Sequence, residues 1–369
     1  MHTFETMDLT PELLRAVNKL GFTEPTSIQV KAIPELLEGR DVLGQAQTGT
    51  GKTAAFGLPM INQLDLESER IQGLVLAPTR ELAIQVSDAI YSYGKFSKIK
   101  VMPVYGGQSY SIQLKKLKQG SHIVVGTPGR VLDLIRKKAL DLSHVSFLVL
   151  DEADEMLNMG FIEDVEEIIE QTPKTRQTSL FSATLPHVIR RLADKHLQNP
   201  IEIKTHSTKV TVDKIEQCYF LLNEGDKFSA LIRIIESDSI PSGLIFMRTR
   251  ARASQFADKL VENKLSAEAL HGEMKQSARE QVMERFRRKQ TRFLVATDVA
   301  ARGLDIEDVS HVINFDIPHD RESYVHRIGL TGRAGKTGIA VSFVTPQENK
   351  KLRDIENFIS QKIPTAKLP

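Results

Sequence analysis

The chain has 369 residues, of which 41% are hydrophobic and 26% are charged. This length favours two domains, and the composition is typical of a globular protein that buries a core in each half. A formal net charge of only +2 does not by itself mark a nucleic-acid-binding protein, so any polyanion must be bound by a local patch or by backbone N–H groups.

Cysteine content and terminal sequence bear on the compartment. The single cysteine, Cys218, cannot form an intrachain disulfide, which suits a reducing environment. Glu5 and Asp8 stand near the N-terminus, and no long apolar stretch of the signal-peptide type follows. No segment approaches the ~18 apolar residues that span a bilayer. We therefore expect a cytosolic, cytoplasmic protein with no membrane partner.

Short apolar, β-branched segments alternate with longer amphipathic ones through the first half of the chain. The predicted strands are Asp41–Gln45, Gly73–Ala77, Val101–Val104, His122–Val125, Phe147–Leu150, Thr178–Phe181 and Ile201–Ile203. Helical patterns, as in Ala54–Gln63 and Arg80–Tyr91, lie between most of them. This alternation predicts a mostly parallel sheet with helices on both faces.

The polar segment Lys204–Thr211 interrupts the pattern, and we interpret it as a linker. A second series of strands follows, with helices between them and a helical pattern over Gln347–Gln361. These strands are Gln217–Leu221, Gly243–Phe246, Arg292–Ala296, His311–Asn314 and Ile339–Val344. The simplest architecture is two similar α/β units in tandem.

A glycine-rich segment follows the first predicted strand and opens a helix. Gly49 and Gly51 let backbone N–H groups turn inward around phosphate oxygens. Lys52 supplies a charge to the β/γ-phosphates, Thr53 supplies a hydroxyl for Mg²⁺, and the helix N-terminus adds a favourable dipole. The alternative is a glycine-rich turn that binds nothing. We predict a nucleotide site over Ala46, where the usual pattern begins with Gly, and over Gln47, Thr48, Gly49, Thr50, Gly51, Lys52 and Thr53.

An apolar strand that ends in two carboxylates, Asp151 and Glu152, provides the acidic partner that such a loop needs. Asp151 is expected to hold Mg²⁺ through water, and Glu152 to orient or deprotonate the attacking water. In isolation the pair could equally be a solvated strand end. Beside a phosphate loop it predicts a catalytic centre.

Residues 151–154 read Asp-Glu-Ala-Asp, and the chain here resembles the DEAD-box family of RNA helicases. The resemblance runs from Phe4 to about Thr345, with the family's motifs in order. It implies two RecA-like domains, ATP and Mg²⁺ as ligands, RNA as partner, and ATP hydrolysis coupled to local duplex unwinding. The implied organisation is a Q-motif region over 1–30, an ATP-binding domain over 31–204, a linker over 205–212 and a C-terminal domain over 213–362.

The resemblance also assigns roles within the first domain. Gln29 is implied to read the N6/N7 edge of adenine, and Phe22 to stack on the base. Ser182 and Thr184 match the motif that links hydrolysis to strand separation. Hydroxyl, Gly and Arg residues suit phosphate and sugar contacts. Those implied to face RNA are Pro78, Thr79, Arg80, Gly106, Gly107, Thr127, Pro128, Gly129 and Arg130.

The second half carries no phosphate loop, so it cannot be an independent ATPase. In the resemblance, Asp305 holds the ribose, His326 belongs to the coupling machinery, and Arg333 reaches the γ-phosphate across the interdomain cleft. The residues implied to face RNA are Gln276, Arg279, Thr297 and Gly303.

The chain departs from the family pattern at Leu330, where the family usually has Arg. One of two expected arginine fingers is absent, and such a finger is worth roughly 10³–10⁵ in rate. A lone Arg333 predicts slow turnover unless Arg327 or Lys336 compensates. Two further functions stay open: an ATP-gated RNA clamp with little turnover, and a DNA-acting translocase, because no single residue proves that the 2′-OH is read.

Overall fold

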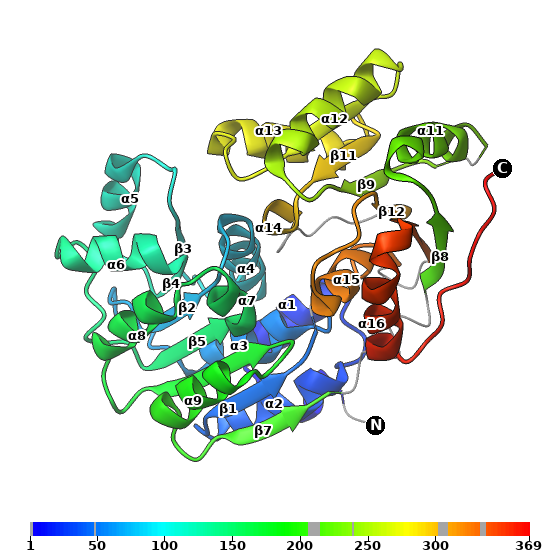
Figure 1. Ribbon diagram of the computed structural model, residues 1–369. Coiled ribbons are helices and arrows are strands. Elements are labelled where there is room, and N and C mark those ends of the chain that lie inside the picture. Colours follow the sequence, from blue (N-terminus) through cyan, green and yellow to red (C-terminus); the bar gives the residue numbers. More distant parts are fainter. Residues whose placement is uncertain (1–2, 48, 206–214, 238–239, 302–308, 333–336) are drawn as a thin grey trace. The chain divides into compact units, whose positions relative to one another are not determined.

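The chain divides into two compact units, Met1–Ser207 and Thr208–Pro369. The computed structural model describes residues 3–47, 49–205, 215–237, 240–301, 309–332 and 337–369. Residues 206–212 of the predicted linker lie outside these ranges. Each unit is built around one parallel sheet with helices packed against it (Figure 1).

The first unit contains a seven-stranded sheet in the order β3-β4-β2-β5-β6-β1-β7, and its neighbouring strands all pair in parallel. The strands are β1 Val42–Gln45, β2 Gly73–Leu76, β3 Val101–Val104, β4 Ile123–Gly126, β5 Phe147–Asp151, β6 Gln177–Ser182 and β7 Ile201–Lys204. The helices are η1 Phe4–Thr6, α1 Pro11–Lys19, α2 Ser27–Leu37, α3 Lys52–Gln63, α4 Arg80–Tyr93, α5 Tyr110–Leu117, α6 Pro128–Arg136, α7 Ala153–Asn158, α8 Ile162–Glu170 and α9 His187–His196.

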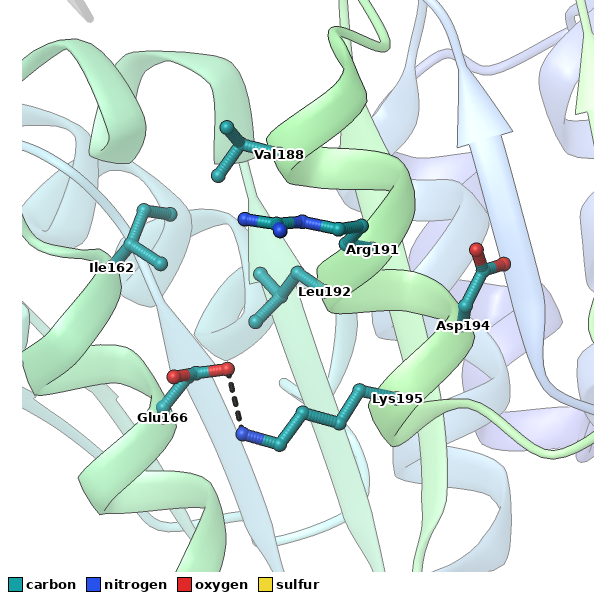
Figure 2. Close-up of a pocket in the computed structure, with 7 residues that line it drawn as sticks. All are labelled: Ile162, Glu166, Val188, Arg191, Leu192, Asp194 and Lys195. Carbon is teal, nitrogen blue, oxygen red and sulfur yellow. Dashed lines mark hydrogen bonds and ion pairs between the residues drawn. The ribbon is translucent and has the colours of Figure 1, made fainter.

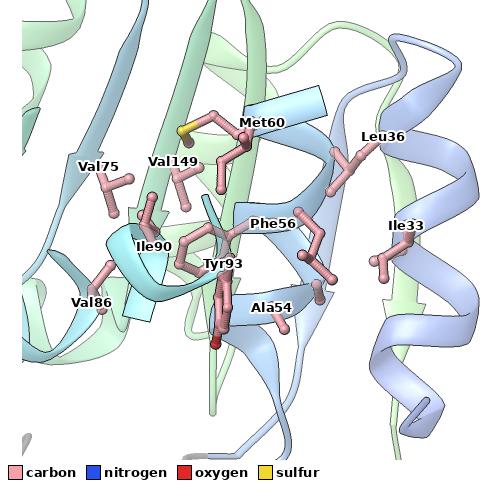
Figure 3. Packing of buried hydrophobic residues seen from close by; sticks show 14 of the residues in the cluster. Ile33, Leu36, Ala54, Phe56, Met60, Val75, Val86, Ile90, Tyr93 and Val149 are labelled. Carbon is pink, nitrogen blue, oxygen red and sulfur yellow. The ribbon is translucent and has the colours of Figure 1, made fainter. Parts of the chain in front are cut away.

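Both faces of this sheet are buried. Val75 of β2 belongs to a core cluster with α2, α3 and α4, whereas its neighbours Leu74 and Leu76 belong to a second cluster with α6 to α9. Successive side chains of a strand point to opposite faces, so an uninterrupted apolar strand requires cover on both sides. Figure 3 shows part of the first cluster, which includes Phe56 of α3 and Tyr93 of α4.

The second unit contains a six-stranded parallel sheet in the order β10-β11-β9-β12-β13-β8. Its strands are β8 Ile215–Leu221, β9 Gly243–Phe246, β10 Ala267–Leu270, β11 Phe293–Ala296, β12 His311–Asn314 and β13 Gly338–Val344. The helices are η2 Glu224–Asp226, α11 Lys227–Ser237, α12 Arg250–Glu262, α13 Gln276–Arg287, α14 Asp298–Ala301, α15 Arg321–Ile328, η3 Pro346–Glu348 and α16 Asn349–Ile359. Within the part of the chain that the structure describes, no helix is long and apolar enough to cross a bilayer.

The predicted fold class is confirmed, since both units are parallel sheets with helices on both faces. Every predicted strand overlaps an observed one, with ends displaced by at most two residues. The sequence patterns missed β10, whose residues Ala-Glu-Ala-Leu are good helix formers. Among the described strands, β10 lies at the edge of the sheet and pairs with β11 alone, so its conformation is set by the neighbouring strand rather than by its own propensity.

Candidate nucleotide and RNA site

Six predicted motifs of the first unit lie at the carboxyl ends of strands, whereas Phe22 and Gln29 precede β1. The six lie at the ends of β1, β2, β3, β4, β5 and β6, in segments 46–53, 78–80, 106–107, 127–130, 151–154 and 182–184. In a parallel sheet these ends share one edge, where α/β proteins bind ligands. The fold therefore gathers segments that are far apart in sequence at a single edge.

The phosphate loop has the backbone conformation that its glycines permit. Gly49 has φ +80° and Gly51 has φ +89°, both in the left-handed region that disfavours a side chain. Gly51 caps α3, which begins at Lys52, and a Cβ at Gly51 would overlap the amide of Gln29. Thr50 Oγ1 donates to the carbonyl of Gln47 at 2.7 Å, which closes the loop on itself. Thr48 lies outside the described residues.

Ala46, at the position where the usual pattern has Gly, is 2% exposed and belongs to the first core cluster. Its N–H donates to the carbonyl of Ser182 at 3.0 Å, which ties the start of the loop to the end of β6. The alanine methyl is thus accommodated by packing. Thr53, in the first turn of α3, is half-buried.

Three charged side chains are buried at the mouth of this loop. Lys52 Nζ lies 3.7 Å from Asp151 Oδ1 and 3.9 Å from Glu152 Oε1, and each of the three residues is at most 6% exposed. Both separations exceed hydrogen-bond length. Among the described residues, Lys52 Nζ and Asp151 Oδ1 have no hydrogen-bond partner. Buried polar atoms are normally paired, so these two indicate a place where a ligand supplies the missing contacts.

The charges shift one another's protonation. Burial alone would lower the pKa of Lys52, but the nearby carboxylates of Asp151, Glu152 and Asp154 outweigh it and raise that pKa, so the ammonium form is stable. Burial raises the pKa of Asp151 to about 6, although the Lys52 cation acts in the opposite direction. A divalent cation would favour the ionised form of Asp151, so the donor set suits Mg²⁺ with its preference for carboxylate and hydroxyl oxygens.

The backbone of Glu152 is strained. Its φ of +52° and ψ of +53° place a non-glycine residue in the left-handed region, at the N-cap of α7. Such a conformation costs on the order of 1–3 kcal/mol and is concentrated at functional sites. The turn between β5 and α7 brings the Glu152 carboxylate toward Lys52.

Asp154, for which the sequence patterns predicted no role, joins two motifs. Its Oδ2 accepts from both the N–H and the hydroxyl of Thr184, each at 2.8 Å. Ser182 Oγ accepts from the Asp154 N–H at 3.2 Å and donates to the Thr184 carbonyl at 2.6 Å. The segment after β6 is thus bonded to the segment after β5. The second Asp of Asp-Glu-Ala-Asp was the only sequence signal for this contact.

The predicted adenine-reading residues have clear positions. Gln29 is 4% exposed, its Nε2 donates to the Gly51 carbonyl at 3.1 Å, and its Oε1 accepts from the Thr26 N–H at 2.8 Å. Gln29 therefore caps α2 and supports the phosphate loop at once. Phe22 is half-buried, with ring centroids 6.2 Å from Phe4 and 6.1 Å from Tyr93. Their role toward adenine stays a prediction.

The RNA-facing residues predicted in the first unit lie in three adjoining loops. Arg80, in the first turn of α4, has its guanidinium against Gly106 and Gly107, and Gly107 has φ +85°. Thr79 caps α4 by accepting from the Leu82 N–H at 3.2 Å. Pro78 directly precedes Thr79 and is buried. The other four residues open α6, with Thr127 as N-cap followed by Pro128, Gly129 and Arg130.

In the second unit, Gln276 and Arg279 lie in the first turn of α13 and are buried. Arg279 donates to the carbonyl of Ala300 in α14 at 3.4 Å, and the Thr297 carbonyl accepts from the N–H groups of Ala300 and Ala301. The structure thus brings these three residues into one neighbourhood. His326 lies in the last turn of α15 and is half-buried. Gly303, Asp305 and Arg333 lie outside the described residues.

Leu330 and Arg327 are both part of the interior of the second unit. Leu330 is 7% exposed and packs in a core cluster with residues of β9, β11 and β12. Arg327 is 3% exposed and donates Nε and Nη2 to the Asp298 carboxylate, at 2.5 and 2.8 Å. Its Nη1 donates to Asn314 Oδ1 and to the Asp316 carbonyl. Arg327 is therefore fully engaged inside its own unit, and Lys336 lies outside the described residues.

A separate groove of about 520 Å³ lies between α8 and α9 (Figure 2). Ile162, Val188 and Leu192 form its apolar part, and the ion pair of Glu166 with Lys195, at 2.9 Å, borders it. None of its lining residues belongs to the predicted nucleotide or RNA site.

Known proteins resemble the chain over its full length. Residues 26–192 match the DEAD/DEAH box helicase family, and residues 226–335 match the helicase conserved C-terminal domain. DEAD-box ATP-dependent RNA helicase CshA of Bacillus cereus is 50% identical over 369 residues, which cover 100% of this chain and 70% of that protein. CshA of Geobacillus kaustophilus is 48% identical over 369 residues, with 100% and 79% covered.

Solved structures of DEAD-box proteins are also similar to this chain. Dbp5 of S. cerevisiae, bound to RNA and ADP BeF3, is 35% identical with a TM-score of 0.91, covering 99% of this chain and 96% of that one. A DEAD box protein from Methanococcus jannaschii is 44% identical with a TM-score of 0.57, covering 99% of each chain. Together with the buried Asp-Glu-Ala-Asp centre beside a phosphate loop, these similarities show that the chain belongs to the DEAD-box family of ATP-dependent RNA helicases.

Proposed function

We propose that this protein hydrolyses ATP at the strand ends of its first unit and couples the hydrolysis to RNA binding and local duplex unwinding. The observation that supports it most is the buried trio of Lys52, Asp151 and Glu152 beside the phosphate loop. Lys52 Nζ and Asp151 Oδ1 are buried without hydrogen-bond partners among the described residues. A phosphate oxygen and a metal-bound water are the contacts that would satisfy them.

The nucleotide's phosphates lie on the 46–53 loop in this proposal. Lys52 neutralises the β- and γ-phosphates, and Thr53 and Asp151 would hold Mg²⁺, which would screen the charge that develops on the phosphates. Glu152 orients the attacking water. The strained turn at Glu152 holds that carboxylate on the same side of the loop as Lys52. Its backbone is therefore set before the substrate arrives.

Gln29 suits adenine even though both ends of its amide are already used. An amide nitrogen has two donor hydrogens and an amide oxygen has two acceptor sites, and the protein occupies one of each. One donor and one acceptor remain, as the N7 and N6 of adenine require. Phe22 provides the neighbouring ring, and Asp305 is proposed to hold the ribose.

RNA is proposed to lie along the loops that carry Arg80, Gly106, Gly107 and Arg130, and along the α13 and α14 starts of the second unit. Contacts would be to phosphate and sugar, so affinity should fall with salt by about 0.7 log units per neutralised phosphate. Closure of the units then brings Arg333 to the γ-phosphate, so that hydrolysis requires both ligands. The bonds between Asp154 and Thr184 are the proposed route from the phosphates to the RNA side.

Steady-state ATP hydrolysis, measured with and without a single-stranded polyribonucleotide, tests this function. RNA is expected to raise the rate, and DNA of matched sequence to raise it less. Glu152→Gln is expected to abolish turnover in both cases. An ATPase that responds equally to DNA would favour the translocase, and one that ignores both polymers would overturn the helicase.

A second function, an ATP-gated RNA clamp with slow turnover, is favoured by the surroundings of Leu330. Leu330 is an apolar core residue and supplies no charge. The guanidinium of Arg327 is bonded to Asp298, so it is not available to replace the missing arginine finger. Single-turnover hydrolysis at saturating RNA separates the two functions. A rate near zero while RNA stays bound identifies the clamp, and rapid hydrolysis with RNA release identifies the helicase.

A further inference from the structure

The helix α5 has an unusual buried residue. Gln113 is the only side chain of α5 that is fully buried, at 0% exposed, while the apolar Leu114 and Leu117 of the same helix are only partly buried. A short helix ordinarily buries its apolar residues and exposes its amides. A polar group in that position is costly unless every hydrogen bond is made. The amide of Gln113 is therefore expected to be buried for its hydrogen bonds and not for packing.

Gln113 makes hydrogen bonds to residues of two other segments. Its Nε2 donates to the carbonyl of Tyr105 and to Oε1 of Gln108, both at 2.9 Å. Its Oε1 accepts from Arg130 Nη1 at 3.0 Å. Only one orientation of the amide fits, because a guanidinium can only donate and a carbonyl can only accept. Gln113 thus joins the loop after β3 to the first turn of α6.

These two segments are the ones to which RNA contacts are assigned. Tyr105 immediately precedes Gly106 and Gly107, and Arg130 belongs to the 127–130 motif. Arg130 also lies 5.8 Å from the centroid of the Tyr110 ring and donates to the Gln108 carbonyl at 3.4 Å. Arg130 is therefore held from several sides, and its hydrogen bond to the Gln113 amide, at 3.0 Å, is shorter than the one to the Gln108 carbonyl.

We propose that Gln113 is a positioning residue for RNA: it fixes the Arg130 guanidinium and the Gly106–Gly107 loop in one geometry before RNA binds. The inference rests on the proposed RNA-binding function, and it adds a residue that itself touches no RNA. A fixed guanidinium binds a phosphate without first losing side-chain entropy. Losing the amide should therefore weaken RNA binding and leave nucleotide chemistry intact.

The test compares Gln113→Leu, Gln113→Met, Arg130→Met and the double variant Gln113→Leu/Arg130→Met, using a single-stranded oligoribonucleotide as probe. Each single variant should raise the RNA concentration for half-maximal ATPase by about tenfold, within the hundredfold that a misplacement of about 1 Å costs. In the two Gln113 variants, the ATPase rate at saturating RNA and the KM for ATP should stay unchanged. Gln119→Leu, an exposed glutamine that follows the same helix, should match the unmodified protein.

Non-additivity decides between positioning and general stabilisation. If Gln113 acts through Arg130, the double variant should be close to the Arg130→Met variant alone, because one interaction is removed twice. A hundredfold effect in the double variant, or a loss of RNA binding that only tracks a falling Tm in both Gln113 variants, would overturn the proposal. If the unmodified protein neither binds RNA nor responds to it, the proposed function itself fails, and that outcome is seen before any variant is compared.

Discussion

The two units each bury a lysine among carboxylates, but they use the charge differently. Lys227 of the second unit is 1% exposed, and its Nζ bonds to Glu224 at 2.9 Å, with Glu348 at 3.8 Å. Lys52 of the first unit is equally buried, yet its nearest carboxylate is 3.7 Å away and its Nζ makes no hydrogen bond within the described residues. The close partners of Lys227 indicate a structural role, whereas a buried cation without hydrogen bonds is expected to bind a ligand.

Other residues of the two units show the same difference between paired and unpaired groups. In the second unit Arg327 is hydrogen-bonded to Asp298, Asn314 and Asp316, so its guanidinium has a structural role within that unit. In the first unit the loops keep glycines in left-handed conformations and a strained Glu152. Among the described residues, two sheets of similar topology thus differ in whether these buried charges are paired.

The largest expected effect is on the structural lysine. Lys227→Met removes the buried cation of this cluster, while Arg252 still pairs with Glu224 and Asp316 and Arg248 with Glu348. The free energy of unfolding should therefore fall by about 3 kcal/mol, the lower end of the cost of breaking a buried pair. Denaturant unfolding measures it, with the exposed Lys350→Met as control. The ATPase rate of the remaining folded protein should be retained. Unchanged stability would show that the paired lysine is dispensable.

Lys52→Met should produce the opposite pattern. Removing one preorganised cation from the phosphates should reduce ATP turnover by about 10²–10³-fold, by analogy with the loss of one oxyanion donor. Stability should change far less than in Lys227→Met. Exposed Lys95→Met serves as the matched control. If turnover survived while stability collapsed, Lys52 would be an architectural residue like Lys227.

Leu330→Arg sharpens the comparison within the second unit. We expect the ATPase rate to rise by at least about tenfold, because an arginine finger is worth roughly 10³–10⁵ in related phosphoryl-transfer enzymes. Loss of leucine packing from the core should lower the free energy of unfolding at the same time. Leu330→Gln loses the packing without adding the charge. Equal rates in Leu330→Arg and the unmodified protein would show that the departure is harmless.

The smallest effect concerns pH. His122 is 2% exposed and its Nδ1 accepts from the Lys100 N–H at 3.1 Å. Burial, followed by the Lys100 cation, lowers the pKa of His122 below its ordinary value. The folded state therefore resists protonation, and the free energy of unfolding should fall as pH drops through about 6.5, where the unfolded chain takes up the proton.

The change in stability with pH measures this contribution. One proton contributes at most about 1.4 kcal/mol per pH unit. Between pH 7.5 and 5.5, the free energy of unfolding of His122→Asn should change less steeply with pH than that of the unmodified protein. The exposed control His187→Asn should show the same change with pH as the unmodified protein. Identical slopes in all three proteins would contradict the assignment of Nδ1 as a buried acceptor.

Sequence reasoning predicted the parts of the molecule that depend on local pattern. The apolar strands, the glycines of the phosphate loop and the carboxylates after β5 each show a short-range signal. What it missed depends on long-range contacts. Ala267–Leu270 is a strand because β11 pairs with it, the amide of Gln29 reaches Gly51, and Asp154 binds Thr184 across 30 positions of sequence. The core position of Leu330 was likewise visible only in the fold.

Linkage between the two ligands tests the central claim most directly. The affinity for a non-hydrolysable ATP analogue should be measured by equilibrium titration with and without saturating single-stranded RNA. If closure assembles one site from both units, RNA should tighten analogue binding, and the analogue should tighten RNA binding by the same factor. Identical affinities in the presence and absence of RNA would contradict the account.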